Sequence, residues 1–199
     1  MADWCGYPLH AACGAGAEGE VRALLRAGAD CDAKVGDVGD EAANAWYRSV
    51  TPLIEAASEG HVGTVRVLLG AGARVDLAKA DGTTPLCIAA QEGHLDVVRC
   101  LLQHHAAVDL AKQTGATPLY MAAQEGHIDV VRCLLQHHAT VDLADQDGRT
   151  PLQAAALDGH VEVLRHLVER GAAVNHTDNR RWTAAMEAAS EGHTAALRV

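Results

Sequence analysis

Two consecutive stretches decide the fold: residues 84–116 read TPLCIAAQEGHLDVVRCLLQHHAAVDLAKQTGA, and residues 117–149 read TPLYMAAQEGHIDVVRCLLQHHATVDLADQDGR. Each is 33 residues long, since 117 − 84 = 33. The tetrad Thr-Pro-Leu-x recurs at this step from Thr51 to Thr150, and a degraded form, TAAM, starts at Thr183. A fixed period of this length is typical of an array of stacked supersecondary units.

The chemistry of one unit predicts two short helices. Thr84 is a good N-cap, and Pro85 occupies the first helical position, where its missing N–H costs nothing. Gly93 favours a left-handed residue that ends this helix. A second helix then places an apolar stripe along residues 97–102. Neither helix is long enough to be stable alone, so we expect neighbouring units to stack on one another.

The string T-P-L-x-x-A-A-x-x-G-H at 33-residue spacing resembles the ankyrin-repeat family from Tyr7 to Val199. This resemblance implies an all-α fold, an ankyrin-repeat solenoid of stacked helix-turn-helix units with projecting β-turn or hairpin loops. It also implies that the inner helices and the turns form a concave binding face. Proteins of this family are mostly recognition modules and are rarely enzymes, so we expect a protein that is not an enzyme.

The period organises the chain as a single ankyrin-repeat domain over residues 1–199. The step from Tyr7 to Thr51 is 44 residues, eleven more than one period, which predicts an inserted loop at about 34–50. The first copy has the polar character of an N-terminal cap. The last copy stops inside its second helix, and both a worn cap and a chain that continues would explain it. The repeats are expected at about 4–33, 47–79, 80–112, 113–145, 146–178 and, incomplete, 179–199.

Composition limits the classes of partner. The chain has 26 acidic and 16 basic residues, a formal charge of −10, which argues against nucleic acid as a partner. It favours another protein, one with a basic surface. The N-terminus lacks the pattern of a signal peptide, and no apolar run approaches the ~20 residues of a membrane span. The six cysteines contain no CxxC pair. We expect a monomer in the cytoplasm or nucleus, with free thiols and no membrane insertion.

The histidines invite a metal hypothesis, which the spacing disfavours. Those of the recurring Gly-His pair are expected to hydrogen-bond local backbone. His105 and His138 stand where other copies have Gly, which predicts a left-handed conformation. Cys100 with His104, and the matching pair one repeat later, could hold zinc weakly, but neighbouring helices pack ~8–10 Å apart and the pairs would not converge. No catalytic motif is present. We expect no catalytic, metal or cofactor site; a metal- or redox-responsive solenoid is a weaker alternative.

Two ladders of charge follow the period. Arginines recur at 66, 99, 132, 165 and 198. Three of them, Arg99, Arg132 and Arg165, follow an acid by three residues, at Asp96, Asp129 and Glu162, which predicts ion pairs on an exposed helix face. A second ladder stands just before each Gly-His pair. It serves equally well as a track for a basic partner or as a source of solubility. Its members are Glu59, Glu92, Glu125, Asp158 and Glu191.

The leading functional hypothesis is a protein–protein interaction scaffold that binds through its concave face and turns. The alternative is a regulatory or targeting segment of a larger protein with an adaptor or enzyme domain beyond Val199. Trp46 and Tyr47 close the inserted loop. They either fold back onto the solenoid, the commoner fate of such residues, or are offered to a partner, and we hypothesise that these two act in recognition with Trp182. The candidate partner-binding residues are Trp46, Tyr47, Glu59, Glu92, Tyr120, Glu125, Arg149, Asp158 and Trp182.

Overall fold

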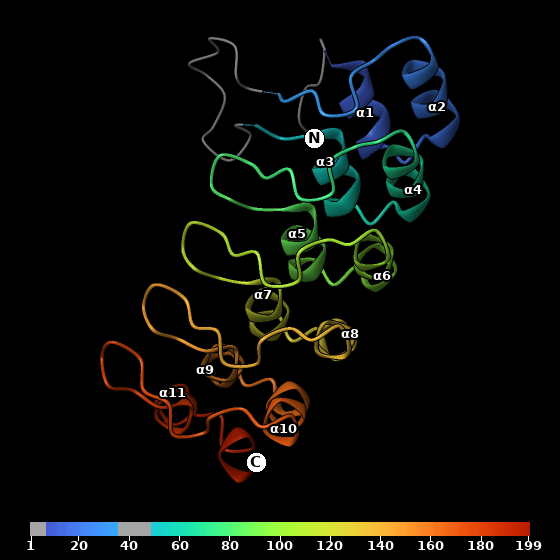
Figure 1. The fold of residues 1–199 in the computed structure, drawn as a ribbon. Coiled ribbons are helices and arrows are strands. Elements are labelled where there is room, and N and C mark those ends of the chain that lie inside the picture. Colours follow the sequence, from blue (N-terminus) through green and yellow to red (C-terminus); the bar gives the residue numbers. More distant parts are fainter. Residues whose placement is uncertain (1–6, 36–48) are drawn as a thin grey trace. The chain divides into compact units, whose positions relative to one another are not determined.

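The computed structural model describes residues 7–35 and 49–199, and its elements there are helices (Figure 1). A seven-residue helix alternates with a nine-residue helix, and the chain ends in a 3-10 turn. The bounds are α1 Pro8–Gly14, α2 Glu18–Arg26, α3 Pro52–Ser58, α4 Val62–Gly70, α5 Pro85–Gln91, α6 Leu95–Gln103, α7 Pro118–Gln124, α8 Ile128–Gln136, α9 Pro151–Leu157, α10 Val161–Glu169, α11 Ala184–Ser190 and η2 Ala196–Arg198.

Threonine caps start the first helix of each later copy. The Thr84 hydroxyl accepts a hydrogen bond from the Cys87 N–H at 3.1 Å, and Thr117 does the same for Tyr120 at 3.1 Å. Thr150 adds the reciprocal contact, because its own N–H donates to the Gln153 side chain at 3.0 Å. The predicted cap-and-proline start is therefore confirmed.

Left-handed residues reverse the chain after each helix. Gly93 and Gly126, which follow first helices, both have φ of +77°. After the second helices, Gly171 has φ of +88°, while His105 and His138 adopt +63° and +64°. The left-handed histidines are thus confirmed, and they are tolerated because His visits this region more readily than most side chains.

The described residues form two compact units. Unit 1 holds the residues up to Ala89 together with Asp96–Ala107, and unit 2 holds Ala90–Leu95 and Val108–Val199. In unit 1, α1 packs on α3 and α2 packs on α4. In unit 2, α9 packs between α7 and α11, while α8 and α10 lie beside them and pack on each other (Figure 1). Within each unit the helix pairs stack as an ankyrin-repeat solenoid requires.

Small and branched apolar residues fill the cores. In unit 2 the side chains of Leu119, Leu134 and Leu167 are fully buried. Each contributes about 1.5–3 kcal/mol relative to exposure. The alanine pair Ala122-Ala123 is also fully buried, which lets adjacent helices approach closely. The absence of Phe from the sequence is consistent with this tight spacing.

Histidine rings of the Gly-His pairs at 61, 127 and 193 bond to the preceding copy. In unit 1, the Nε2 of His61 donates to the carbonyl oxygen of Gly14 at 3.0 Å. In unit 2, His193 contacts the carbonyl oxygen of Leu157 in the same way at 3.0 Å. The prediction of a local backbone bond is wrong, because the accepting carbonyl belongs to the preceding repeat. These rings satisfy the carbonyls that the end of each first helix leaves unpaired.

Carboxylates make a second set of links between copies, one that the sequence reasoning missed. In unit 2, Asp109 accepts from the backbone N–H of Thr140 at 3.0 Å, and Asp142 accepts from that of Ala173 at 3.1 Å. Each bond joins residues 31 apart in the chain. A charged acceptor makes a stronger hydrogen bond than a neutral one, so each link helps to hold neighbouring turns in register.

Candidate functional site

The acids of the second helices are neutralised within their own helix. Arg99 lies 3.8 Å from Asp96, Arg132 lies 3.7 Å from Asp129, and Arg165 lies 3.8 Å from Glu162. The i, i+3 pairs predicted from the sequence are confirmed. Their side chains are more than half exposed, so each pair contributes only about 0.3–0.5 kcal/mol.

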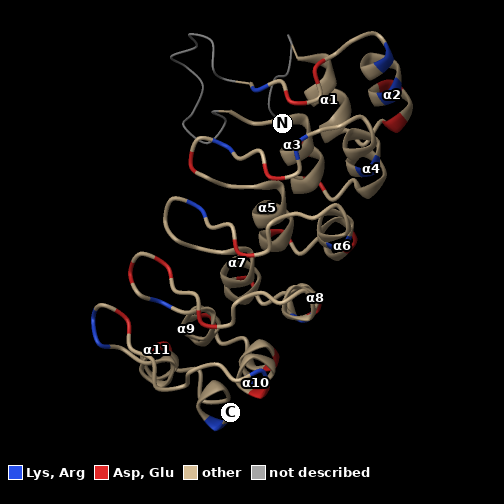
Figure 2. Cartoon of the chain, viewed as in Figure 1, with Lys and Arg blue, Asp and Glu red and all other residues tan. Residues whose placement is uncertain are grey.

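The acids that close the first helices behave differently. They are exposed, and within the described part of the chain none of them forms an ion pair. Figure 2 marks the acidic and basic residues along the ribbon. Glu92 accepts only from the neighbouring Gln91 amide at 3.3 Å. We call these residues the acidic ladder: Glu92, Glu125, Asp158 and Glu191 in unit 2, with Glu59 in unit 1.

Tyr120 is a buried residue of unit 2 that interacts with two residues of a turn, Asp145 and Arg149. It is only 7% exposed and packs with Ala116, Met121 and Ala154. Burial and the hydrogen-bonded carboxylate of Asp145 raise the pKa of its hydroxyl, with Arg149 acting in the opposite direction. This hydroxyl therefore stays protonated and positions Asp145 and Arg149. Tyr120 is a positioning residue, and a partner would meet little of its surface.

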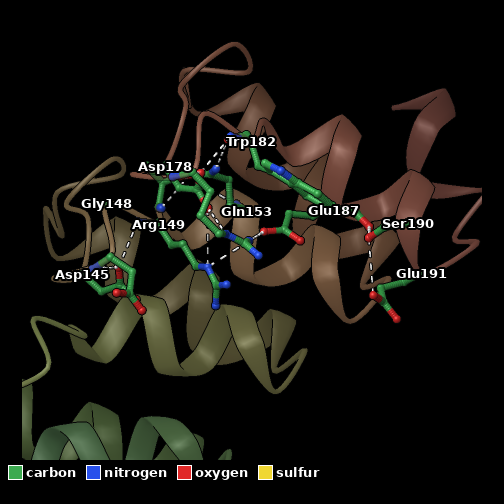
Figure 3. A network of polar contacts seen from close by, with 12 residues as sticks. Asp145, Gly148, Arg149, Gln153, Asp178, Trp182, Glu187, Ser190 and Glu191 are labelled. Atoms are coloured by element: carbon green, nitrogen blue, oxygen red, sulfur yellow. Dashed lines mark hydrogen bonds and ion pairs between the residues drawn. The ribbon is translucent and has the colours of Figure 1, made fainter.

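Arg149 contacts both Asp145, which lies beside Tyr120, and the acids Asp178 and Glu187 near the end of the chain (Figure 3). Its backbone N–H donates to Asp145 at 2.8 Å. Its Nε lies 3.8 Å from Oδ2 of Asp178 and 3.9 Å from Oε1 of Glu187. The side chains of Asp178 and Glu187 are only 1% and 3% exposed. These distances allow charge attraction but exceed hydrogen-bond length, so Nε is buried without a hydrogen-bond partner.

Arg180 and Trp182 complete the network. The Nε of Arg180 donates to Asp178 Oδ2 at 2.9 Å, and its Nη2 contacts Glu187 Oε1. The Arg180 guanidinium lies over the Trp182 ring, 4.9 Å from its centroid. Trp182 is held through its backbone, since its N–H donates to Asp178 at 2.7 Å and its carbonyl accepts from Gln153 at 2.7 Å. Burial opposes ionisation of Asp178, but these hydrogen bonds outweigh it and hold its pKa below the usual value.

The network thus unites three sequence-predicted residues, Tyr120, Arg149 and Trp182, in unit 2. Asp178, Arg180 and Glu187 were not among the candidate partner-binding residues predicted from the sequence. One signal was available: Glu187 occupies the register that is apolar in the three preceding copies, at Ile88, Met121 and Ala154. An acid at an apolar position is expected only when it has a partner.

The predicted recognition residues Trp46 and Tyr47 lie outside the described residues. What the structure describes is the base of the inserted loop. Val35 and Val50 form an antiparallel bridge there, with N–H to carbonyl distances of 3.0 Å from Val35 to Val50 and 2.8 Å from Ser49 to Val35. His10 in α1 also donates to the Val50 carbonyl at 3.1 Å.

The Cys133–His137 pair makes a local contact. The Nδ1 of His137 donates to the carbonyl oxygen of Cys133 at 2.9 Å, and lies 4.0 Å from its sulfur. Over residues 7–35 and 49–199, no three His, Cys, Asp or Glu side chains gather in a metal-binding arrangement.

A family model described as ankyrin repeats in three copies matches residues 53–145 and 137–199, and a single-repeat model matches residues 7–35. The chain belongs to the ankyrin-repeat family. Ankyrin repeats are generally protein–protein interaction modules and are typically not enzymes. A comparison with curated proteins finds no match. None of the described helices is long and apolar enough to cross a membrane.

Proposed function

We propose that this protein is a non-catalytic binding module that holds a partner protein through a basic segment lying along the unit 2 members of the acidic ladder. One contrast carries the proposal. The acids of the second helices are paired with arginines, whereas the ladder acids of the first helices are exposed and form no ion pair within the described residues. Unpaired charge is available to a partner.

Electrostatics favours this role over added stability. An exposed carboxylate contributes little to folding, but a row of like charges attracts an oppositely charged partner over about a Debye length, ~8–10 Å at physiological salt. The chain's formal charge of −10 strengthens the attraction. Such steering accelerates association and weakens as salt is added. A monomer in the cytoplasm or nucleus is also part of the proposal, and reduced thiols there agree with the five free cysteines among the described residues.

The stacking of unit 2 suggests how the partner's charges are spaced. The ladder acids Glu125, Asp158 and Glu191 follow α7, α9 and α11, which pack in sequence. Packed helices lie ~8–10 Å apart, and a polyproline II chain rises ~3.1 Å per residue with about three residues per turn, so every third side chain lies on the same face. A partner in this conformation would therefore match one ladder acid with every third residue.

Synthetic peptides test the proposal. The probe carries arginine at every third position over ten residues, and its affinity is measured by fluorescence anisotropy at low and physiological salt. In the ladder variant, Glu92→Gln, Glu125→Gln and Asp158→Asn remove three charges. The control variant, Asp96→Asn, Asp129→Asn and Glu162→Gln, removes the same three charges from paired positions.

We expect the ladder variant to lose about tenfold in affinity, or ~1.4 kcal/mol, with a weaker salt dependence. The control variant should lose less than about threefold. Equal losses in the two variants would show that only net charge matters, and the ladder would then be no more than a source of solubility. Absence of binding to wild-type protein would also reject the proposal.

A further inference from the structure

We infer that Asp178, Glu187 and Trp182 form a guanidinium-binding pocket for an arginine side chain of the partner, and that Arg180 fills this pocket from within the chain. The inference rests on the proposed function, because it assigns one anchoring site to the basic partner. It adds two features that the acidic ladder does not involve: a guanidinium as the ligand, and Arg180 as a competitor within the chain.

The two carboxylates require cations. With side chains 1% and 3% exposed, Asp178 and Glu187 would be costly to bury as unpaired charges. Arg149 supplies positive charge at 3.8 and 3.9 Å without a hydrogen bond from Nε. The side-chain hydrogen bonds from a cation come instead from Arg180. The pocket therefore keeps its own counter-charge in Arg149, while its hydrogen-bonding position is held by a second guanidinium.

The geometry around Arg180 fits both surfaces of a guanidinium. The central carbon of the guanidinium lies over the Trp182 ring, 4.9 Å from its centroid, within the range of a cation–π contact. The N–H edge meets one carboxylate at 2.9 Å through Nε and the other through Nη2. A planar group with forked donors suits this arrangement, whereas the ammonium of lysine cannot stack and bind both acids in the same way.

The walls of the pocket are fixed, and its occupant is exposed. Asp178 is held by the Trp182 N–H, and the Trp182 carbonyl is held by Gln153, both at 2.7 Å (Figure 3). Arg180 in contrast is 49% exposed and stands on an exposed turn beside Arg181, a non-glycine residue at φ of +64°. Because Arg180 is exposed, a partner's guanidinium can replace it and take over its bonds to the two carboxylates, while the backbone bonds of Asp178 and Trp182 stay in place.

Among copies three to six, only the last has all three pocket residues, Asp178, Trp182 and Glu187. The register of Asp178 holds Lys79, Lys112 and Asp145 in the earlier copies. The register of Trp182 holds Thr83, Ala116 and Arg149, and that of Glu187 holds Ile88, Met121 and Ala154. Only the last of these copies thus combines an acid, a tryptophan and a second acid at the three registers.

The test removes the Arg180 side chain from the pocket. In Arg180→Ala, methylguanidinium should bind saturably, shift the NMR resonance of the Trp182 indole N–H and raise the melting temperature. Methylammonium, which lacks the planar fork, should do neither. Wild-type protein should respond about tenfold more weakly to methylguanidinium, because Arg180 competes for the pocket. The double variant Arg180→Ala with Glu187→Gln should bind about as weakly as methylammonium does.

Peptide binding separates this inference from the proposed function. Arg180→Ala should bind the arginine-spaced peptide about tenfold more tightly than wild type, since the internal competitor is gone. Methylguanidinium binding should persist in the ladder variant carrying Arg180→Ala, whatever happens to the peptide. If Arg180→Ala folds and gives no saturable methylguanidinium response, the pocket does not exist. If that variant fails to fold, the wild-type titration decides: no selective shift of the Trp182 resonance overturns the inference.

Discussion

The ring of His160 covers Gly126 of the preceding repeat so closely that a Cβ atom on this glycine would lie 2.5 Å from Nδ1 of the histidine. Gly126 also has φ of +77°, where a side chain is strained in any surroundings. Gly171 shares the left-handed conformation at +88° but has open space where its Cβ would be. A side chain at Gly171 would therefore meet backbone strain alone, whereas one at Gly126 would meet backbone strain and also the ring of the next repeat.

Gly126→Ala should destabilise the protein more than Gly171→Ala does. Backbone strain costs each variant about 1–2 kcal/mol, and displacement of the His160 ring adds about 1–3 kcal/mol to the first alone. Urea unfolding measures both free energies. Equal losses would mean that the ring moves aside freely and that the contact does not stabilise the stack.

Acidification should weaken unit 1 through His10. Burial lowers the pKa of this histidine, although hydrogen bonds to the carbonyls of Val50 and Ala33 oppose the shift. The unfolded chain therefore takes up a proton near pH 6.5 that the folded chain does not, and stability falls as the pH drops below this value. His10→Gln keeps a donor and removes the titration, so its unfolding free energy should vary less between pH 7 and pH 5. An unchanged pH profile in the variant would assign the effect elsewhere.

Cys13 should be unreactive toward alkylation. Burial and the nearby Glu55 charge raise the pKa of its thiol to about 12, and its side chain is fully buried. Cys31 also has a raised pKa, because of burial and its acidic neighbours Asp32 and Asp30, but it is partly exposed. Iodoacetamide at pH 8, followed by peptide mass spectrometry, should label Cys31 long before Cys13. Comparable rates would show that α1 opens readily.

Amidation of Asp178 should destabilise the protein far more than amidation of Asp158. Asp178→Asn removes a buried charge that faces Arg180 and Arg149, and should cost about 3 kcal/mol of unfolding free energy. Asp158→Asn removes an exposed ladder charge and should change stability by less than about 0.5 kcal/mol. Thermal unfolding at neutral pH gives both values. Because the pKa of Asp178 is lowered, the difference should shrink as the pH falls below about 4.

The scaffold was predictable from the sequence because its signals are local. A threonine cap, a proline and a left-handed glycine act within a few residues, so Thr84, Pro85 and Gly93 indicate a helix without reference to the rest of the chain. The exposed pairs such as Arg99 with Asp96 are equally local, being three residues apart.

Contacts between repeats were harder to foresee. The partner of His61 is Gly14, 47 residues away, and nothing in the Gly-His pair itself identifies that carbonyl. Glu187 and Asp178 are also separated in sequence, and the irregular last copy hides their relationship. Its substitutions appear as losses against the repeat pattern, and only the folded chain shows that they meet.

The links from Asp109 to Thr140 and from Asp142 to Ala173 each join one turn to the next and reach no further. Such a chain, pulled from its ends, carries the load through neighbouring links in series. The weakest link yields first, and its loss leaves the remaining contacts intact. Unit 2 should accordingly lengthen in discrete steps under tension and recoil when the force is released, as an extensible spring does.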